Sequence, residues 1–409
     1  MKVWIKYLIG VALGVAAAFI LPTENTVCVD IFAFLTDLFI RFGRYLVVPL
    51  VFTTVIVSVH KLRTSRLLLK SAIWTFSSII IFSLILTLIG VVSILVVKLP
   101  RIPITVDVAS EVQHLDIKSM VLSLFPMSAF EALNEGSFLL VSFVLAFLIG
   151  WESASEEVIF KPVAALADSA SKLFYNIANF FSEIIAIFCV AVVCYWMIKF
   201  NNIMELGIYK PLILMFICDF VIVAGIIYPL IIRILCHDPH PYKVLYAAIA
   251  PLIISFFSGD SNLVLPLMNR HGKESLGIRR RSRGFTYSLF SIFSRGGSAL
   301  VASISFVLIW RSYSSLSMPV SDILWIFGLS FGLSFLLGGI PSGGAFILLT
   351  ILCDRYAKGF ETSFLLLQPA SLIICSFASL FDTITSMVGS YIVAVKTKLI
   401  EHHTVKHFI

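Results

Sequence analysis

The sequence predicts an all-α polytopic membrane protein, and three observations carry this prediction. Of the 409 residues, 59% are hydrophobic and only 13% are charged, whereas soluble domains carry about 25% charged residues. The mean hydropathy is +1.02. The run from Ser71 to Val97 contains no charged residue and exceeds the about 20 apolar residues that a spanning helix needs. Lipid is therefore the expected solvent for most of the chain.

Eight segments are apolar and long enough to cross a bilayer as helices. They cover residues 3–22, 34–58, 71–97, 121–150, 173–198, 211–232, 285–310 and 362–395. The first segment contains a lysine and lacks a small-residue cleavage site, so we expect a membrane anchor there and not a signal peptide.

Two further apolar segments are interrupted and predict re-entrant helical hairpins. Val244–Ser258 is too short to span comfortably, and it runs through a Gly-Asp-Ser-Asn turn into Leu263–Met268. Ile323–Cys353 is interrupted by the glycine-rich stretch Gly338–Gly344. Because lipid cannot satisfy irregular backbone, such tips must be shielded by protein or water. A single helix kinked at Pro341 is the alternative for the second segment.

Broken apolar elements of this kind indicate transport. The two interrupted segments are each followed by a full span, which suggests an inverted repeat. In secondary transporters such elements meet near the midplane of the bilayer and expose helix ends to the solute. The pattern therefore favours movement of a small polar solute over mere membrane anchoring.

Basic residues predict the orientation of the chain. Lys61, Arg63, Arg66, Lys70 and the run Arg279–Arg283 fall in loops on the same side of the predicted membrane. The positive-inside rule makes this side cytoplasmic, which places both termini in the cytoplasm and the chain in the cell (inner) membrane. A basic cytoplasmic loop explains the Arg279–Arg283 run without a nucleic-acid partner. The expected partners are the lipid bilayer and a small-molecule solute.

Motifs for catalysis and for metal binding are missing. The seven cysteines form no C-x-x-C pair, which argues against a disulfide framework and a zinc site. No pairing of a nucleophile with a base and no soluble domain of useful size is recognisable. We therefore expect no enzyme, no catalytic or metal-binding residues and no cofactor.

Several segments resemble the glutamate transporter family, the dicarboxylate/amino acid:cation symporters. Arg44–Phe52 (RYLVVPLVF) is similar to the family's second span, Phe125–Gly136 to the start of its fourth and Tyr175–Asn179 to part of its fifth. Leu265–Met268 follows the position of the first hairpin tip, and Gly339–Ala345 (GIPSGGA) is similar to the second. The likeness keeps the order and spacing of the elements over nearly the whole chain.

The resemblance implies an elevator-type transporter fold with eight transmembrane helices and two hairpins, assembled as a homotrimer. Residues 1–70 and 117–199 would form a static scaffold. Residues 71–99 and 208–409 would form a mobile transport domain that carries the solute. Members of this family import acidic or neutral amino acids or dicarboxylates, driven by sodium ions or protons.

The resemblance also implies a solute site between the two hairpin tips and the seventh and eighth spans. The implied substrate-binding residues are Asp260, Ser261, Asn262, Arg295, Pro341, Ser342, Gly343, Gly344, Ser379, Asp382, Thr383 and Ser386. The implied ion-coupling positions are Ser77, Ser78, Ser294, Gly296, Ser386 and Ser390.

The sequence departs from the family pattern at these functional positions. The N-M-D-G-T motif of the seventh span corresponds to residues 294–298, so that Gly296 stands where the family keeps a sodium-binding aspartate. In the eighth span, Asp382 takes the position of an arginine that pairs with the substrate's side-chain carboxylate. Ser379 takes that of an amine-binding aspartate, and Ser390 that of a second sodium ligand.

Arg295 lies deep in its predicted span, roughly 16–22 Å from either end at 1.5 Å per residue. A lone arginine at this depth costs at least about 2.5–3.5 kcal/mol. We therefore expect Arg295 to face the protein interior with an acidic partner, either Asp382 or Asp260. Such a pair is either a structural lock between the seventh and eighth spans or also part of the solute site.

The departures leave the coupling ion open. A hard cation requires compensating negative charge. Because the two aspartates of the family are replaced here, we expect sodium coupling to be lost or weakened. The positive charge of the Arg295 guanidinium would then take the place of the charge of the sodium ion. Coupling to protons through Asp382 or Asp260 is the alternative.

The sequence predicts a secondary active importer of a small amino acid or dicarboxylate by cation symport. A sodium-independent transporter of a neutral or cationic solute, proton-coupled or uncoupled, and a channel-like anion-conducting member are the alternatives.

Overall fold

The computed structural model describes residues 2–20, 26–103, 117, 121–122, 138–205, 207–314, 318–339, 343–356, 358–401 and 408. Within these ranges the chain is almost entirely helical and contains no strand. Eight of the helices in the described ranges are long and apolar enough to cross a membrane. The predicted class, an all-α polytopic membrane protein, is confirmed.

The longer helices are separated or extended by one π-helical turn (η1) and two 3₁₀ turns (η2 and η3). In chain order the elements are α1 (Val3–Ile20), α2 (Thr26–Thr64), α3 (Leu68–Val96), α6 (Phe138–Ser153), α7 (Glu157–Glu205), α8 (Lys210–Ile222), η1 (Val223–Ile227), α9 (Tyr228–Cys236), α10 (Tyr242–Ser258), α11 (Leu265–Glu274), α12 (Arg280–Phe293), α13 (Gly296–Tyr313), α14 (Val320–Ser334), η2 (Leu336–Gly339), α15 (Gly344–Tyr356), η3 (Ser363–Leu367) and α16 (Ser371–Lys396).

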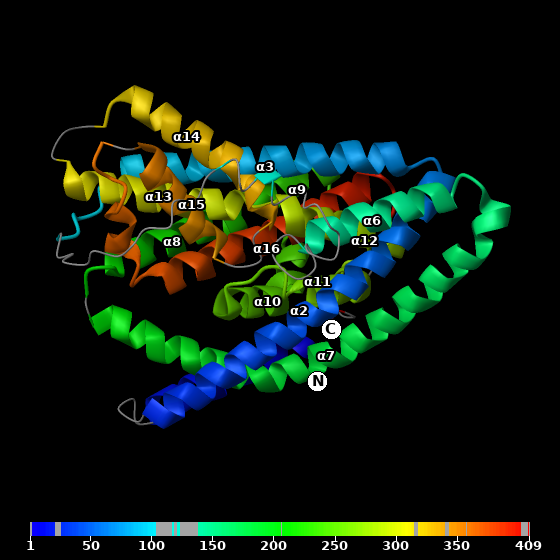
Figure 1. Cartoon of the computed structure of the whole chain (residues 1–409), viewed down its shortest axis with the longest axis horizontal. Coiled ribbons are helices and arrows are strands. Elements are labelled where there is room, and N and C mark those ends of the chain that lie inside the picture. Colours follow the sequence, from blue (N-terminus) through cyan, green and yellow to red (C-terminus); the bar gives the residue numbers. More distant parts are fainter. Residues whose placement is uncertain are drawn as a thin grey trace.

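The helices pack as two groups. α1, α2, α6 and α7 contact one another, and the long α2 and α7 run along one side of the molecule (Figure 1). The remaining helices pack around α13 and α16, which bury nearly all of their residues. α12 lies against α2 and joins the two groups. We call them the α7 group and the α13 group. The division into a static scaffold and a mobile domain stays a prediction.

Two helices extend well beyond the predicted spans. α2 covers Thr26–Thr64, where the sequence predicted 34–58, and α7 covers Glu157–Glu205, where it predicted 173–198. At 1.5 Å per residue the 49 residues of α7 are about 74 Å long, far more than the about 30 Å of a hydrocarbon core. The predicted bounds were too short because hydropathy detects only apolar turns, whereas the first part of α7 carries charged residues such as Asp168 and Lys172.

The eighth and fourth spans also differ from the prediction. α16 begins at Ser371 and not near residue 362, because Pro369 has no N–H to donate to a helix. Of the fourth predicted span, 121–150, the structure describes only 121–122 and the part within α6. The residues between them, with the motif at 125–136, lie outside the described ranges. The first arm of the second hairpin, Val320–Gly338, counts among the eight long apolar helices, whereas α6 is shorter.

The described parts of both interrupted segments fold as pairs of contacting helices. α10 contacts α11, α14 contacts α15, and α10 and α15 both pack on α16. The first turn begins at Gly259, whose positive φ of 64° ends α10 while its N–H donates to the Ser255 carbonyl at 3.0 Å. Gly343, at φ 75°, directly precedes α15. Both segments therefore pack on the same central helix, α16.

Close approach of backbones holds α3 against α13. A Cβ added at Gly90 of α3 would lie 2.7 Å from the Leu300 carbonyl oxygen and 2.8 Å from Ser303 Oγ. By contrast, no described atom lies within 4 Å of a Cβ added at Gly328 of α14. Packing between helices in membranes depends on such small residues.

We therefore expect Gly90→Ala to destabilise the protein by about 1–3 kcal/mol through overpacking. Gly328→Ala is the matched control, since alanine favours helix over glycine by about 1 kcal/mol and meets open space. The thermal unfolding midpoints of the two purified variants in detergent test this expectation. Equal midpoints would show that the α3–α13 contact is not as close as described.

Candidate functional site

The helix that corresponds to the seventh span is broken at its centre. α12 ends at Phe293 and α13 begins at Gly296. Ser294, with ψ 69°, and Arg295, with φ −102° and ψ 27°, have left the helical region. Two consecutive glycines make an uninterrupted helix unfavourable here, so the first N–H groups of α13 are free to bind other acceptors.

Arg295 extends from this break toward the first hairpin tip. Its Nη1 donates to Ser261 Oγ at 2.6 Å and its Nη2 to Asn262 Oδ1 at 3.1 Å. The residue is only 6% exposed, as predicted from its depth in the span. The guanidinium thus fixes the first hairpin tip against the break in the seventh span.

Asp382 of α16 contacts the same break. Its Oδ1 accepts the Gly297 N–H at 2.8 Å and its Oδ2 accepts Ser298 Oγ–H at 3.0 Å. The same Oδ2 lies 3.9 Å from Arg295 Nη1, and the residue is 2% exposed. A carboxylate at a helix N-terminus is favoured by the helix dipole. Asp382 therefore compensates both the start of α13 and the charge of Arg295.

The second aspartate has a different partner. Asp260 Oδ2 lies 2.9 Å from Arg44 Nε of α2, and its side chain is fully buried. Its Oδ1 accepts the Asn262 N–H at 2.9 Å, which closes the turn of the hairpin tip. Among the described residues, Asp382 is thus the carboxylate that lies within ion-pair distance of Arg295. The sequence left the choice between the two aspartates open and did not assign Arg44 a role.

A small cavity lies between the hairpin tips, α13 and α16. Its volume is about 10 Å³, which is at the limit for a single water molecule. The predicted site residues among those that line it are Arg295, Gly343, Gly344, Ser379 and Asp382. Gly259, Ser298 and Cys375 also line it and were not predicted. Gly259 of the first hairpin and Gly343 of the second thus line one cavity with an oppositely charged pair.

Ser379 and Thr383 link α16 to α10 beside this cavity, whereas Ser386 bonds within α16. Ser255 of α10 shares a hydrogen bond with Thr383 at 2.6 Å, and Ser379 Oγ donates to the Ser255 carbonyl at 2.6 Å. Ser386 Oγ donates within its own helix to the Asp382 carbonyl at 2.8 Å. Pro341 and Ser342 lie outside the described residues.

Gly296, one of the predicted ion-coupling positions, has no room for a larger side chain. A Cβ added at Gly296 would lie 2.6 Å from Ser83 Cα of α3. The hydroxyls of Ser294 and Ser390 are buried without a hydrogen-bond partner in the described part of the chain. Ser78 is buried and Ser77 half-buried on α3. Within the described ranges, no three His, Cys, Asp or Glu side chains gather as a metal site.

The sequence model of the sodium:dicarboxylate symporter family matches residues 3–396. The chain belongs to this family. Its members are transporters and not enzymes, so the resemblance and the non-enzymatic character predicted from the sequence are confirmed.

Individual transporters are similar to the chain at low identity. The proton/sodium-glutamate symport protein of Geobacillus stearothermophilus is 23% identical over 77% of the chain and 76% of its own length. A serine/threonine transporter of Enterococcus faecalis is 23% identical over 73% of the chain and 69% of its own length. The human neutral amino acid transporter B(0) is 28% identical over 28% of the chain and 21% of its own length.

Charge compensation between Arg295 and Asp382 predicts a non-additive mutant cycle. Removing the charge of one partner leaves the other buried and uncompensated, so Arg295→Gln or Asp382→Asn should each destabilise the protein by about 3 kcal/mol. The double variant should recover part of this loss. The asparagine side chain in Asp382→Asn keeps an oxygen that can accept the Gly297 N–H. The loss of stability in this variant therefore reports the removed charge and not the loss of that hydrogen bond.

Thermal unfolding of the four purified proteins in neutral detergent measures the cycle. Losses that simply add in the double variant would mean that the two charges do not interact.

Proposed function

We propose that the chain is a secondary active transporter that imports a small amino acid with weak or no sodium coupling, and that the solute binds between the hairpin tips when the small cavity there has widened. The observation that carries the proposal is the placement of Arg295 and Asp382 on one cavity at the helix break. Membership in a symporter family supports the general activity.

The opposite charges around this cavity suit a zwitterion. A solute carboxylate would bind the guanidinium of Arg295, and a solute ammonium would bind Asp382, so both fixed charges would be used. A dicarboxylate would bring its second carboxylate toward Asp382, and like charges in a low-dielectric site repel strongly. Two relatives are named as transporters of serine and threonine and of neutral amino acids. Neutral amino acids are therefore the preferred class, and dicarboxylates remain the competing one.

Weak sodium coupling follows from the absence of a carboxylate at Gly296 and from the lack of space beside it. The family's aspartate position is occupied by Gly296, against which the α3 backbone at Ser83 packs. A sodium ion bound there would lack compensating charge and would lie near a guanidinium that already supplies a positive charge. Coupling to protons through Asp382, or transport without coupling, are the two remaining possibilities.

The proposal includes an elevator movement of the α13 group along the α7 group, in a homotrimer with both termini in the cytoplasm. Three ion pairs connect the two groups in the described conformation. They are Arg44–Asp260 at 2.9 Å, Glu183–Arg270 at 2.8 Å and Asp168–Arg280 at 3.0 Å. Such a movement would have to break these pairs.

Transport in proteoliposomes tests the coupling. We expect uptake of radiolabelled serine to persist when external sodium is replaced by choline, because no aspartate compensates a bound sodium ion. A protonophore then separates proton-coupled from uncoupled uptake, and protein-free liposomes give the background. Uptake that disappears without sodium would contradict the proposal. Large currents in the absence of solute would instead support the channel-like alternative.

Asp382→Asn tests the proposed selectivity. The variant loses the charge that binds the solute ammonium, and a charge-assisted hydrogen bond is worth about 1.5–3 kcal/mol. We therefore expect affinity for neutral amino acids to fall at least about tenfold, while affinity for dicarboxylates holds or rises. Solute-dependent thermal shifts of the purified variant measure both.

Asp219→Asn is the matched control for this variant. Asp219 is an equally buried aspartate that accepts a hydrogen bond from Ser93 at 3.0 Å and does not line the cavity. An equal loss of affinity in both variants would place the effect outside the solute site.

A further inference from the structure

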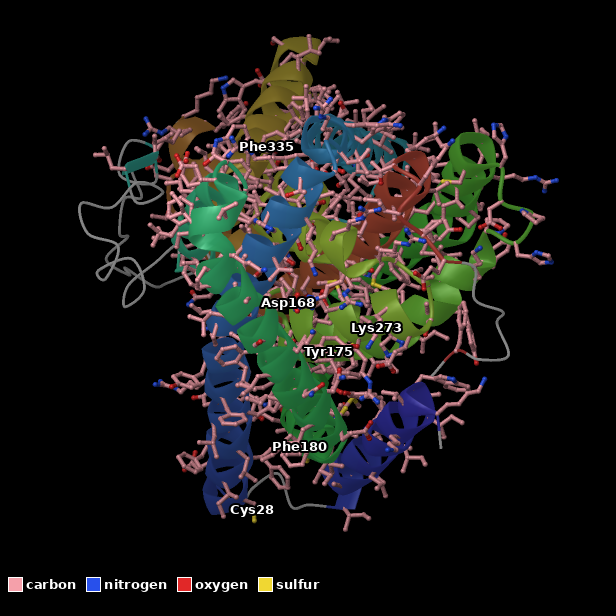
Figure 2. All side chains as sticks on the ribbon, turned by 90° about the vertical axis from the view of Figure 1, so that its right-hand side faces the viewer. Cys28, Asp168, Tyr175, Phe180, Lys273 and Phe335 are labelled. Carbon is pink, nitrogen blue, oxygen red and sulfur yellow. The ribbon has the colours of Figure 1, made fainter. Side chains whose placement is uncertain are left out.

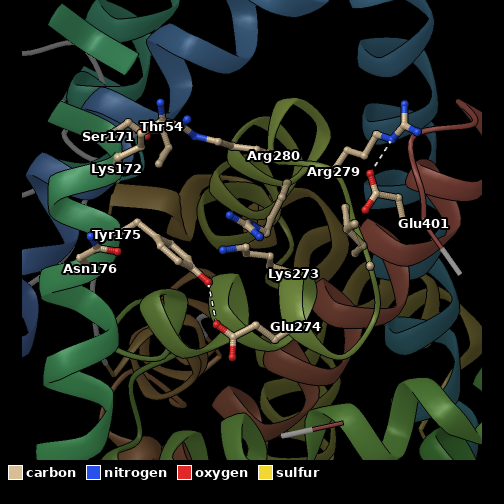
Figure 3. A pocket seen from close by; sticks show the side chains of 13 residues that line it. Thr54, Ser171, Lys172, Tyr175, Asn176, Lys273, Glu274, Arg279, Arg280 and Glu401 are labelled. Atoms are coloured by element: carbon tan, nitrogen blue, oxygen red, sulfur yellow. Dashed lines mark hydrogen bonds and ion pairs between the residues drawn. The ribbon is translucent and has the colours of Figure 1, made fainter. Parts of the chain in front are cut away.

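A second, much larger cavity lies between the α7 group and the α13 group. It has a volume of about 760 Å³, within the range of small-molecule sites. One wall is α7, the opposite wall is the segment from Lys273 to Arg283 that joins α11 to α12, and Glu401 closes one side (Figure 3). None of its lining residues lines the cavity between the hairpin tips.

Positive charge dominates the walls of this cavity. Five cationic side chains line it, Lys172, Lys273, Arg279, Arg280 and Arg283, against two carboxylates. The net charge of the lining side chains is therefore +3. The start of α12 at Arg280 adds the positive end of a helix dipole.

Part of this charge already has a partner. Lys172 and Arg280 both bind Asp168 on α7, at 2.8 Å and 3.0 Å. Arg279 Nε lies 3.2 Å from Glu401 Oε1. These contacts position three of the five cations, and the other two, Lys273 and Arg283, lie on the opposite wall from α7.

Lys273 and Arg283 form no ion pair within the described part of the chain. Both instead lie over the ring of Tyr175, at 4.7 Å and 5.1 Å from its centroid. Figure 2 labels Tyr175 on α7 and Lys273 beside it. Cation–π contacts orient these two groups but do not neutralise their charge.

Arg283 is the observation that points to a ligand. The residue is 4% exposed, and its Nη1 is buried without a hydrogen-bond partner in the described structure. A buried guanidinium N–H left unpaired is unfavourable, and this residue lines the cavity. An acceptor placed in the cavity would satisfy it.

We propose that this cavity binds a phosphate monoester group or inorganic phosphate, with Arg283 and Lys273 as its principal donors. A phosphate monoester carries about −1.5 to −2 charges at neutral pH and three acceptor oxygens, which matches the excess positive charge of the lining better than a single carboxylate does. The guanidinium of Arg283 suits bidentate binding of phosphate oxygens. The group can belong to a lipid head group or to a free phosphate.

The ligand would bridge the two helix groups, since Tyr175 and Lys172 belong to the α7 group and Lys273 and Arg283 to the α13 group. It would therefore stabilise the described arrangement of the groups. Any effect on transport rate rests on the proposed elevator function, but binding itself does not.

Binding of inorganic phosphate to the purified full chain in neutral detergent tests the site. Phosphate should raise the thermal unfolding midpoint relative to potassium chloride of equal ionic strength, because it binds only the folded state. Arg283→Gln and Lys273→Gln should each abolish this rise, and the exposed Lys273 provides a foldable variant if Arg283→Gln does not fold. Arg281→Gln is the matched control, because Arg281 lies in the same basic run and does not line the cavity.

Nanodiscs distinguish the two sources of phosphate. A midpoint that rises with phosphatidic acid, a phosphate monoester lipid, and not with phosphatidylglycerol, a diester, assigns the site to a lipid head group. A rise with soluble phosphate as well assigns it to both. The proposal would be overturned if the unfolding midpoints of Arg283→Gln and Lys273→Gln rose with phosphate as much as that of Arg281→Gln. It would also be overturned if neither phosphate nor phosphatidic acid raised the midpoint of the unmodified protein. These results do not depend on whether the chain transports an amino acid.

Discussion

The charge of Arg295 in the middle of the helix bundle is the constraint on which the surrounding structure depends. A guanidinium at this depth needs acceptors and an opposite charge, and three separate side chains supply them. Ser261 and Asn262 come from the first hairpin tip, and Asp382 comes from α16. Because Asp382 also binds the first N–H groups of α13, one carboxylate fixes the helix break, the arginine and the eighth span together.

Hydropathy and residue depth predicted much of this arrangement from the sequence. Uninterrupted apolar runs indicate spans, glycine-rich interruptions indicate hairpins, and the position of Arg295 predicted its burial. The partner of Asp260 could not be predicted, because Arg44 lies far from it in the sequence and only packing brings α2 to the hairpin tip. Ser298 was missed as well, although its place three residues after Arg295, at the start of α13, is a recognisable signal. The lengths of α2 and α7 were underestimated because polar turns continue these helices beyond the apolar runs.

The contacts between the two helix groups differ in strength. Asp168 is partly exposed and lies outside the predicted fifth span, so its ion pair with Arg280 contributes little because water screens it. Asp260 is fully buried, so separating it from Arg44 would leave an uncompensated charge in the protein interior. If the α13 group moves along the α7 group, breaking the Arg44–Asp260 pair would therefore be the main electrostatic cost of leaving the described arrangement. A phosphate bound in the basic cavity beside Tyr175 would raise this cost.

The close approach of Gly296 to α3 has a consequence for the engineering of this chain. Introducing an aspartate at this position would place its Cβ against the backbone at Ser83, so the substitution on its own would disturb the packing of α3 before any ion could bind. Accommodating the new side chain would require α3 to move away first, through a compensating substitution on another helix. The effect of an aspartate at residue 296 would thus depend on the residues with which α3 packs.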